Sequence, residues 1–112
     1  MNAIYTNMNK HLNSDFFNLL RKIDKDPRIT QRILAKELGL SLGKLNYCLR
    51  ALKEKGLIKI KNFNNSKKKA KYFYYLSPKG VVEKTEATFK FMKLKMKEYE
   101  ELKEELKKTK YV

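Results

Sequence analysis

Cysteine and histidine are almost missing from this 112-residue sequence, which contains one of each, Cys48 and His11. A single cysteine cannot form an intrachain disulfide, and it fits a reducing compartment. The single histidine lies in an asparagine-rich N-terminal stretch without a cluster of cysteine, aspartate or glutamate around it. Because metal sites and catalytic sites need such clusters, we expect a protein that is not an enzyme and that has no metal and no cofactor.

Long apolar runs are missing as well. No stretch approaches the ~20 consecutive apolar residues that a membrane-spanning helix needs. The N-terminal segment MNAIYTNMNKHLN lacks the basic-then-apolar order of a signal peptide. Glycine is scarce, with four residues, and there is no glycine-rich phosphate loop. These absences predict a soluble cytoplasmic protein with no membrane partner.

Basic residues are what the sequence has in excess. Lysine and arginine number 27 against 12 acidic residues, which gives a formal net charge of +15. Residues 1–76 hold 17 of the basic and 5 of the acidic side chains, so the excess lies in the first two thirds of the chain. A basic region of this kind suits a polyanionic partner. The length fits one domain with an appended helix.

Three short amphipathic helices are predicted between residues 14 and 56. The first opens at Ser14 and Asp15 and ends before Pro27, because proline disfavours helical geometry in the residue before it. N-caps and helix-ending glycines mark the other two, at Thr30, Gly39, Ser41 and Gly56. Apolar residues at helical spacing predict the core stripes, which are Phe16, Leu19, Leu20, Ile23, Ile33, Leu34, Ala35, Leu38, Leu45, Cys48, Leu49 and Leu52.

A β-hairpin is predicted after the third helix. The β-prone runs LIKIK and YFYYLS flank the polar segment NFNNSKKKAK. Six lysines and no acidic residue lie from Lys59 to Lys71, as expected of a wing that lies along a nucleic-acid backbone or minor groove. Tyr72, Tyr74 and Leu76 are expected to line the core side of the second strand. The alternative is that the aromatic run stacks on single-stranded bases.

One long helix is predicted from Pro78 to about residue 110, since proline suits a first helical turn. Apolar residues at three-four spacing form a seam along it, with two polar members; the seam comprises Val82, Thr85, Phe89, Met92, Met96, Tyr99, Lys103 and Leu106. We expect the turns from Val82 to Phe89 to pack on the chain's own domain. The distal part needs a partner, and a second copy is the simplest one. The residues expected in this homodimer interface are Phe89, Met92, Met96, Tyr99, Leu102 and Leu106.

These elements predict a mainly α fold with a small β-hairpin, a winged helix-turn-helix followed by a long C-terminal dimerisation helix. The second and third helices are joined by a Gly-Leu-Ser turn, which is the helix-turn-helix pattern. The expected organisation is a flexible N-terminal arm (1–13), a DNA-binding winged helix-turn-helix (14–77) and a dimerisation helix (78–110). In this architecture the recognition helix, here Ser41–Lys55, enters the major groove of double-stranded DNA.

The face of the recognition helix opposite its core stripe has side chains that suit this role. Gly43 lets the helix backbone come close to DNA. Arg50 can pair bidentately with guanine and Asn46 with adenine, and Tyr47 can reach a phosphate or a thymine methyl. The full set of predicted DNA contacts is Thr30, Gln31, Arg32, Ser41, Gly43, Lys44, Asn46, Tyr47, Arg50, Lys61, Lys67, Lys68, Lys69 and Lys71.

Two stretches resemble a known family. TQRILAKELGLSLGKLNYCLRALKEKGLI, followed by YFYYLSPKG, is similar to the MarR-type bacterial transcriptional regulators. The similarity is greatest to a short subgroup linked to exopolysaccharide (EPS) gene clusters, in which SLGKxNYCLxALxEKGL is typical. The resemblance covers about residues 14–105 and implies a dimeric, sequence-specific DNA-binding repressor or activator. Larger MarR proteins have two C-terminal helices, and several bind phenolic ligands beside the dimer interface. This chain has one such helix, which leaves a small-molecule effector open.

Other functions remain as alternatives. RNA or ribosome binding is the main one, because a basic winged helix also fits grooved RNA. Cys48 lies on the inward stripe of its helix, where a thiol is usually an unreactive core residue rather than a redox sensor. The last helix is basic and amphipathic through Lys97, but its acidic end argues against binding to a membrane surface. Failure to bind any nucleic acid at low salt would favour a role in protein binding alone.

Overall fold

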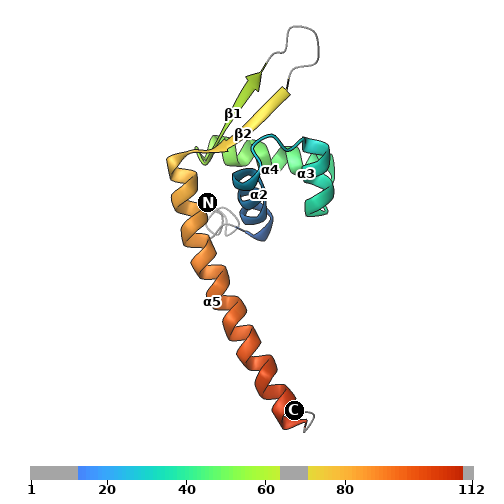
Figure 1. The fold of residues 1–112 in the computed structure, drawn as a ribbon, viewed down its shortest axis with the longest axis vertical. Coiled ribbons are helices and arrows are strands. Elements are labelled where there is room, and N and C mark those ends of the chain that lie inside the picture. The colour runs from blue at the N-terminus through green and yellow to red at the C-terminus, as the bar shows by residue number, and fades with distance from the viewer. Residues whose placement is uncertain (1–12, 64–70, 110–112) are drawn as a thin grey trace, which may run out of the picture.

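The computed structural model describes residues 13–63 and 71–109. Its elements, in chain order, are α2 (Ser14–Lys25), α3 (Gln31–Leu38), α4 (Leu42–Glu54), β1 (Ile58–Phe63), β2 (Lys71–Leu76) and α5 (Pro78–Lys108). The three short helices lie together beneath the hairpin and form what we call the head, and α5 leaves the head as a single long rod (Figure 1). The predicted fold class is confirmed: mainly α, with one antiparallel hairpin and a long C-terminal helix.

Local sequence signals place the helix boundaries. The side chains of Thr30 and Ser41 each accept a hydrogen bond from the backbone N–H three residues later, which confirms both predicted N-caps. Asn13 caps α2 in the same way. Gly39 and Gly56 adopt φ values of 69° and 74°, the left-handed conformation that ends a helix and that glycine adopts without a steric penalty. The short turn between α3 and α4 follows from these caps.

The core lies where the three short helices meet the root of the hairpin. The predicted helix stripes are buried there except for Ile33 and the partly buried Leu38; the buried members are Phe16, Leu19, Leu20, Ile23, Leu34, Ala35, Leu45, Cys48, Leu49 and Leu52. Tyr74 enters this core from β2 and is 2% exposed, and Leu76 is partly buried against it. The hydroxyl of Tyr74 accepts a hydrogen bond from Gln31 Nε2 at 2.8 Å, so its polar end is satisfied.

The prediction is wrong for two residues that were expected in the core and are exposed instead. Ile33 is 48% exposed and Tyr72 is 51% exposed. At about 100° per residue, Ile33, Leu34 and Ala35 together span roughly 200° of a helix, more than one buried face covers. The eight-residue α3 buries Leu34 and Ala35 and leaves Ile33 outside. Tyr72 lies near the start of β2, where the hairpin projects beyond the helices and no helix covers it (Figure 1).

The hairpin is fixed to the helices at its root. β1 and β2 pair antiparallel, with Ile58 opposite Leu76 and Ile60 opposite Tyr74. The backbone N–H of Tyr74 donates to the carbonyl of Pro27 at 3.1 Å, which ties β2 to the loop between α2 and α3. Both the side chain and the backbone of Tyr74 therefore orient the hairpin, whose outer half extends away from the head (Figure 1).

The start of α5 touches the backbone in front of β1. Gly80 is buried there, and a Cβ at this position would lie 2.0 Å from the carbonyl oxygen of Leu57. Only glycine therefore fits without moving one of the two segments. The hydroxyl of Ser77 donates a hydrogen bond to the Gly56 carbonyl and accepts one from the Gly80 N–H. Ser77 therefore caps α5 and also ties its start to the segment that follows α4.

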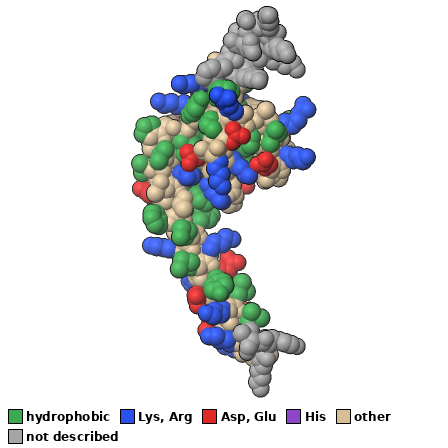
Figure 2. Space-filling model, viewed as in Figure 1, with side chains coloured by type: hydrophobic (Ala, Val, Ile, Leu, Met, Phe, Trp, Pro, Cys, Tyr) green, Lys and Arg blue, Asp and Glu red, His purple; other side chains and the backbone are tan. Residues whose placement is uncertain are grey.

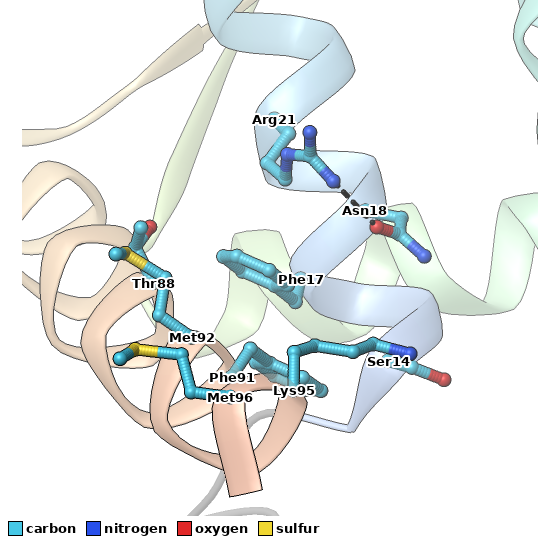
Figure 3. Close-up of a pocket in the computed structure, with 9 residues that line it drawn as sticks. All are labelled: Ser14, Phe17, Asn18, Arg21, Thr88, Phe91, Met92, Lys95 and Met96. Carbon is cyan, nitrogen blue, oxygen red and sulfur yellow. Dashed lines mark hydrogen bonds between the residues drawn. The ribbon is translucent and has the colours of Figure 1, made fainter. Parts of the chain in front are cut away.

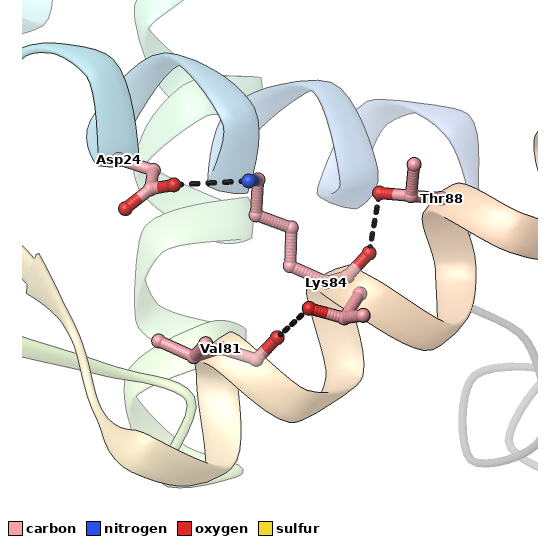
Figure 4. Close-up of polar contacts among 5 residues, drawn as sticks. Asp24, Val81, Lys84 and Thr88 are labelled. Atoms are coloured by element: carbon pink, nitrogen blue, oxygen red, sulfur yellow. Dashed lines mark hydrogen bonds and ion pairs between the residues drawn. The ribbon is translucent and has the colours of Figure 1, made fainter.

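One face of α5 packs on α2 along the next three turns. Lys84 Nζ lies 2.9 Å from a carboxylate oxygen of Asp24 (Figure 4). Ala87 is buried, and the ring of Phe91 stacks on that of Phe17 with centroids 4.5 Å apart. These contacts fix the direction in which α5 leaves the head.

The turns from Val82 to Phe89 therefore pack on the head as predicted, but the seam itself takes no part in this packing. Val82 is 54% and Phe89 61% exposed. The face that packs has residues 80, 84, 87 and 91, and residues 82 and 89 lie two positions, about 200°, from 80 and 87. The seam therefore faces solvent along its whole length. At 31 residues α5 is about 46 Å long, yet in the described part of the chain no helix is apolar enough over its length to cross a membrane.

Candidate nucleic-acid interface

The predicted recognition helix, α4, is held to the head by one stripe and exposes the opposite one. Leu45, Cys48, Leu49 and Leu52 are all buried, which fixes the rotation of the helix about its axis. Asn46, Tyr47 and Arg50 are exposed, with Tyr47 at 56%. Figure 2 shows lysine and arginine side chains distributed over the visible face of the head, with a few acidic side chains among them. The predicted base-reading side chains therefore point to solvent together.

The side chains of this stripe differ in whether they already contact other side chains of the chain. Asn46 and Arg50 make no side-chain hydrogen bond or ion pair with any other described residue. Lys44 Nζ lies 5.4 Å from the centroid of the Tyr47 ring, a cation–π distance. Within the described part of the chain, ordering these two side chains at a partner surface therefore breaks no hydrogen bond or ion pair, which suits recognition of bases by Asn46 and Arg50.

Gly43 lies in the first turn of α4, where the chain itself gives no reason for a glycine. Its φ is not in the left-handed range, and a Cβ built on it would meet only the Ser41 Oγ, at 4.0 Å. Glycine in a helix is less stable than alanine by about 1 kcal/mol. A partner that approaches the helix backbone at this turn would account for a glycine here.

Replacing Gly43 with alanine is expected to change stability and DNA affinity in opposite directions. The free energy of unfolding should rise by about 0.5–1 kcal/mol, because the methyl group meets open space and the unfolded chain loses freedom. Affinity for duplex DNA should fall, because the methyl group separates the helix from the DNA backbone. Thermal melting and a binding titration measure the two effects. A stabilised variant with unchanged affinity would show that nothing approaches this turn.

The start of α3 contributes the second group of predicted contacts. Thr30 is exposed, and its Oγ1 already accepts the Ile33 N–H at 3.2 Å. Arg32 is exposed and has no side-chain partner among the described residues. Gln31 is different, because its Nε2 donates to Tyr74 and holds the root of the hairpin. Its amide is thus partly used inside the chain, a contact that no sequence pattern indicated.

The hairpin adds basic side chains at one edge of the head. Lys59 and Lys61 are exposed on β1, and Lys61 Nζ lies 5.5 Å from the centroid of the Tyr75 ring. Lys71 begins β2, opposite Phe63 in the strand register. The predicted wing contacts Lys67, Lys68 and Lys69 lie outside the described residues.

Leu42 is an exposed apolar residue that the sequence interpretation missed. It is 49% exposed at the first position of α4. Leu42, Asn46 and Arg50 are spaced by four residues and so lie along one side of the helix. An apolar side chain in this row is suited to a thymine methyl group. Leu42 could have been predicted from the sequence, because it lies two four-residue steps before Arg50 on the same side of the helix.

Cys48 behaves as a core residue rather than as a reactive thiol. It is 1% exposed, and burial raises the pKa of its thiol. A raised pKa keeps the sulfur protonated near neutral pH, and the protonated thiol is a poor nucleophile. Within the described part of the chain, no group of three or more histidine, cysteine, aspartate or glutamate side chains is placed to hold a metal ion.

Comparison with known families identifies the head. Residues 17–59 match a family model described as winged helix-turn-helix DNA-binding. The fold is a winged helix-turn-helix. In this fold α3 and α4 are the helix-turn-helix, β1 and β2 form the wing, and α4 occupies the position of the recognition helix. No curated protein gives a significant match to the chain.

Solved structures show the same fold with α5 included. The chain resembles the PcaV transcriptional regulator from Streptomyces coelicolor with a TM-score of 0.65 and 14% identity, over 76% of this chain and 59% of PcaV. A variant of MepR from Staphylococcus aureus gives 0.66 and 18%, over 94% and 82%. The zinc-responsive MarR family member ZitR from Lactococcus lactis gives 0.64 and 22%, over 84% and 62%. The chain thus shares its winged helix-turn-helix fold with these proteins and spans only about 60% of the length of PcaV and ZitR.

Proposed function

We propose that the chain is a sequence-specific, double-stranded DNA-binding transcriptional regulator that acts as a cytoplasmic homodimer. The observation that carries the proposal is the solvent face of α4, where Asn46 and Arg50 are exposed and have no side-chain partner among the described residues, beside the helical Gly43. PcaV and ZitR, whose fold the chain shares, are respectively a transcriptional regulator and a MarR family member. Their similarity supports the regulatory role.

In this proposal each part of the head has a separate task. The side chains of α4 read base edges in the major groove, and the lysine-rich wing lies along the backbone or minor groove. Ser41 and Thr30 present helix N-termini, whose free N–H groups suit phosphates. The segment SLGKLNYCLRALKEKGL follows the pattern that is typical of the EPS-associated subgroup. This resemblance supports exopolysaccharide genes as the regulated genes.

The homodimer is supported by the surface of α5. The six predicted interface residues, Phe89, Met92, Met96, Tyr99, Leu102 and Leu106, are each more than half exposed in the single chain. An apolar surface of this length on a rod that projects from the head is unfavourable in water. A second copy covers it and doubles the number of recognition helices.

Competition between nucleic acids tests the proposal against RNA binding. A labelled duplex DNA bound by the protein is challenged with unlabelled duplex DNA, duplex RNA of the same sequence and single-stranded DNA at one salt concentration. Duplex DNA is expected to compete best, because α4 fits the wide major groove of B-DNA and not the deep, narrow one of A-form RNA. Stronger competition by duplex RNA would replace the proposal with the RNA-binding alternative, and binding to none of them would leave a role in protein binding alone.

A further inference from the structure

We infer that two copies pair through their α5 helices in antiparallel orientation, with the two-fold axis passing between Lys97 and Glu98. The inference deepens the homodimer of the proposed function by naming which surface meets which. It rests on the spacing of the seam, the distribution of charge along α5 and a cavity between α2 and α5. Figure 2 shows the exposed hydrophobic side chains of the lower part of α5 together with the charges that flank them.

The seam is symmetric about this axis. In an antiparallel pair, Met96 of one copy lies opposite Tyr99 of the other, and Phe89 lies opposite Leu106. Met92 then faces Lys103, whose aliphatic stem can pack along it while the ammonium group reaches solvent. All of these side chains are exposed in the single chain and free to pack. A parallel pair would instead place Lys103 against Lys103 in the apolar seam, where like charges repel.

The basic and acidic residues of α5 also lie on opposite sides of the proposed axis. Residues 90–97 contain four lysines and no acidic residue, whereas residues 98–105 contain five glutamates and one lysine. Antiparallel pairing lays the basic block of each copy along the acidic block of the other, and parallel pairing lays like on like. Among the residues that flank the seam, Lys93 then lies beside Glu100 of the second copy and Glu86 beside Lys107. Opposite charges at these flanking positions set orientation in paired helices.

The polar residue near the start of the seam does not oppose pairing. The Thr85 Oγ1 donates to the Val81 carbonyl at 2.8 Å (Figure 4). Its hydroxyl is therefore satisfied within the helix. Covering Thr85 leaves no unpaired polar group behind.

A cavity beside the seam adds to the surface that a second copy covers. It lies between α2 and α5, has a volume of about 510 Å³ and is open on one side; its walls include the stacked rings of Phe17 and Phe91 together with Met92, Lys95 and Met96 (Figure 3). Met92 and Met96 belong to both the cavity and the seam. Any helix that covers the seam therefore also covers the rim of the cavity.

In the antiparallel pair, Leu102 of the second copy is the residue that covers the rim of the cavity. It is 54% exposed and lies beside the seam rather than in it. Two heptads separate it from Thr88 and one from Lys95, so it projects from the same flank of α5 as these two cavity-lining residues. In the antiparallel register this flank meets its own counterpart, which brings Leu102 of the second copy against Lys95 at the mouth of the cavity. An apolar residue off the seam thereby gains an apolar partner surface.

Site-specific cross-linking tests the orientation in the full-length chain. Glu86→Cys and Lys107→Cys are made separately; both positions are exposed and lie off the apolar seam, so pairing is preserved. The parent chain is the matched control, because its only cysteine, Cys48, is 1% exposed. Each variant alone, and a mixture of the two in equal amounts, is treated with a short bismaleimide and the products are identified by mass spectrometry.

The mixture is expected to give the linked Glu86→Cys–Lys107→Cys heterodimer, and each variant alone is expected to give no linked dimer. In the antiparallel pair, identical positions are separated along the axis by about 28 Å or more at 1.5 Å per residue. Linked dimers of each variant alone would establish parallel pairing and overturn the inference, as would a chain that sediments as a monomer. Affinity for duplex DNA is measured on the same samples, so loss of the proposed function and loss of the orientation are separate outcomes.

Discussion

Replacing Arg50 with alanine is expected to lower affinity for the preferred duplex by about 1–3 kcal/mol, a factor of roughly 5 to 150, and to lower affinity for unrelated DNA much less. The guanidinium group can donate two hydrogen bonds to the O6 and N7 atoms of one guanine, and a different base leaves at least one of them unmade. The melting temperature should not change, because Arg50 is exposed and has no side-chain partner among the described residues. Titration of specific and scrambled duplexes at one salt concentration measures the effect.

Arg50→Lys is the matched control for charge. Lysine keeps the positive charge but lacks the planar fork that makes two parallel hydrogen bonds. It should lose most of the discrimination between duplexes while keeping the affinity for unrelated DNA. Equal losses on both duplexes for Arg50→Ala, restored by lysine, would assign Arg50 to a phosphate. A large fall in melting temperature would mean that the exposed face of α4 has been assigned wrongly.

Two charges introduced at the centre of the seam are expected to abolish the dimer. Met96→Lys combined with Tyr99→Lys places four like charges around the proposed two-fold axis. Both positions are more than 60% exposed in the single chain, so the head should remain folded. Affinity for a DNA site with two half-sites should then fall by a factor on the order of 10²–10⁴, because the two heads no longer bind as one unit. Sedimentation measures the first effect and DNA titration the second.

Leu94→Lys is the matched control for these substitutions. Leu94 is 62% exposed on the same helix but lies outside the seam. It should leave both the dimer and the DNA affinity unchanged, apart from a small electrostatic gain. A dimer that survives the double substitution would move the interface away from the seam. Substitutions are preferable to truncation, since the Phe91–Phe17 stack shows that the first turns of α5 belong to the head.

Signals that act over a few residues predicted the fold well. Pro27, Thr30, Gly39 and Ser41 each act on the backbone within about four residues, so the helix boundaries could be located from sequence alone. The outward face of α4 followed from its buried stripe in the same way. The predicted Arg50 orientation needed only the helical period and the positions of four apolar residues.

Contacts between distant segments could not be predicted in this way. The sequence shows one apolar seam along α5 but not which face of the helix meets α2, and the close approach of Gly80 to Leu57 together with the Phe91–Phe17 stack decides it. The exposure of Val82 follows from that choice. The hydrogen bond from Gln31 to Tyr74 joins residues 43 positions apart, and no local pattern encodes it.

Selection of bound sequences from a pool of random DNA duplexes tests most directly whether paired recognition helices read bases. We expect enrichment of an inverted repeat in which each half-site contains a guanine. Selection with the Arg50→Ala variant should no longer favour that guanine. The half-sites should be more than one ~34 Å turn apart, because the starts of the two α5 helices are separated by about 58 Å in the antiparallel dimer, and α4 lies level with that start (Figure 1). A pool in which no sequence is enriched, or in which only a single unrepeated site is enriched, would contradict base reading by paired recognition helices.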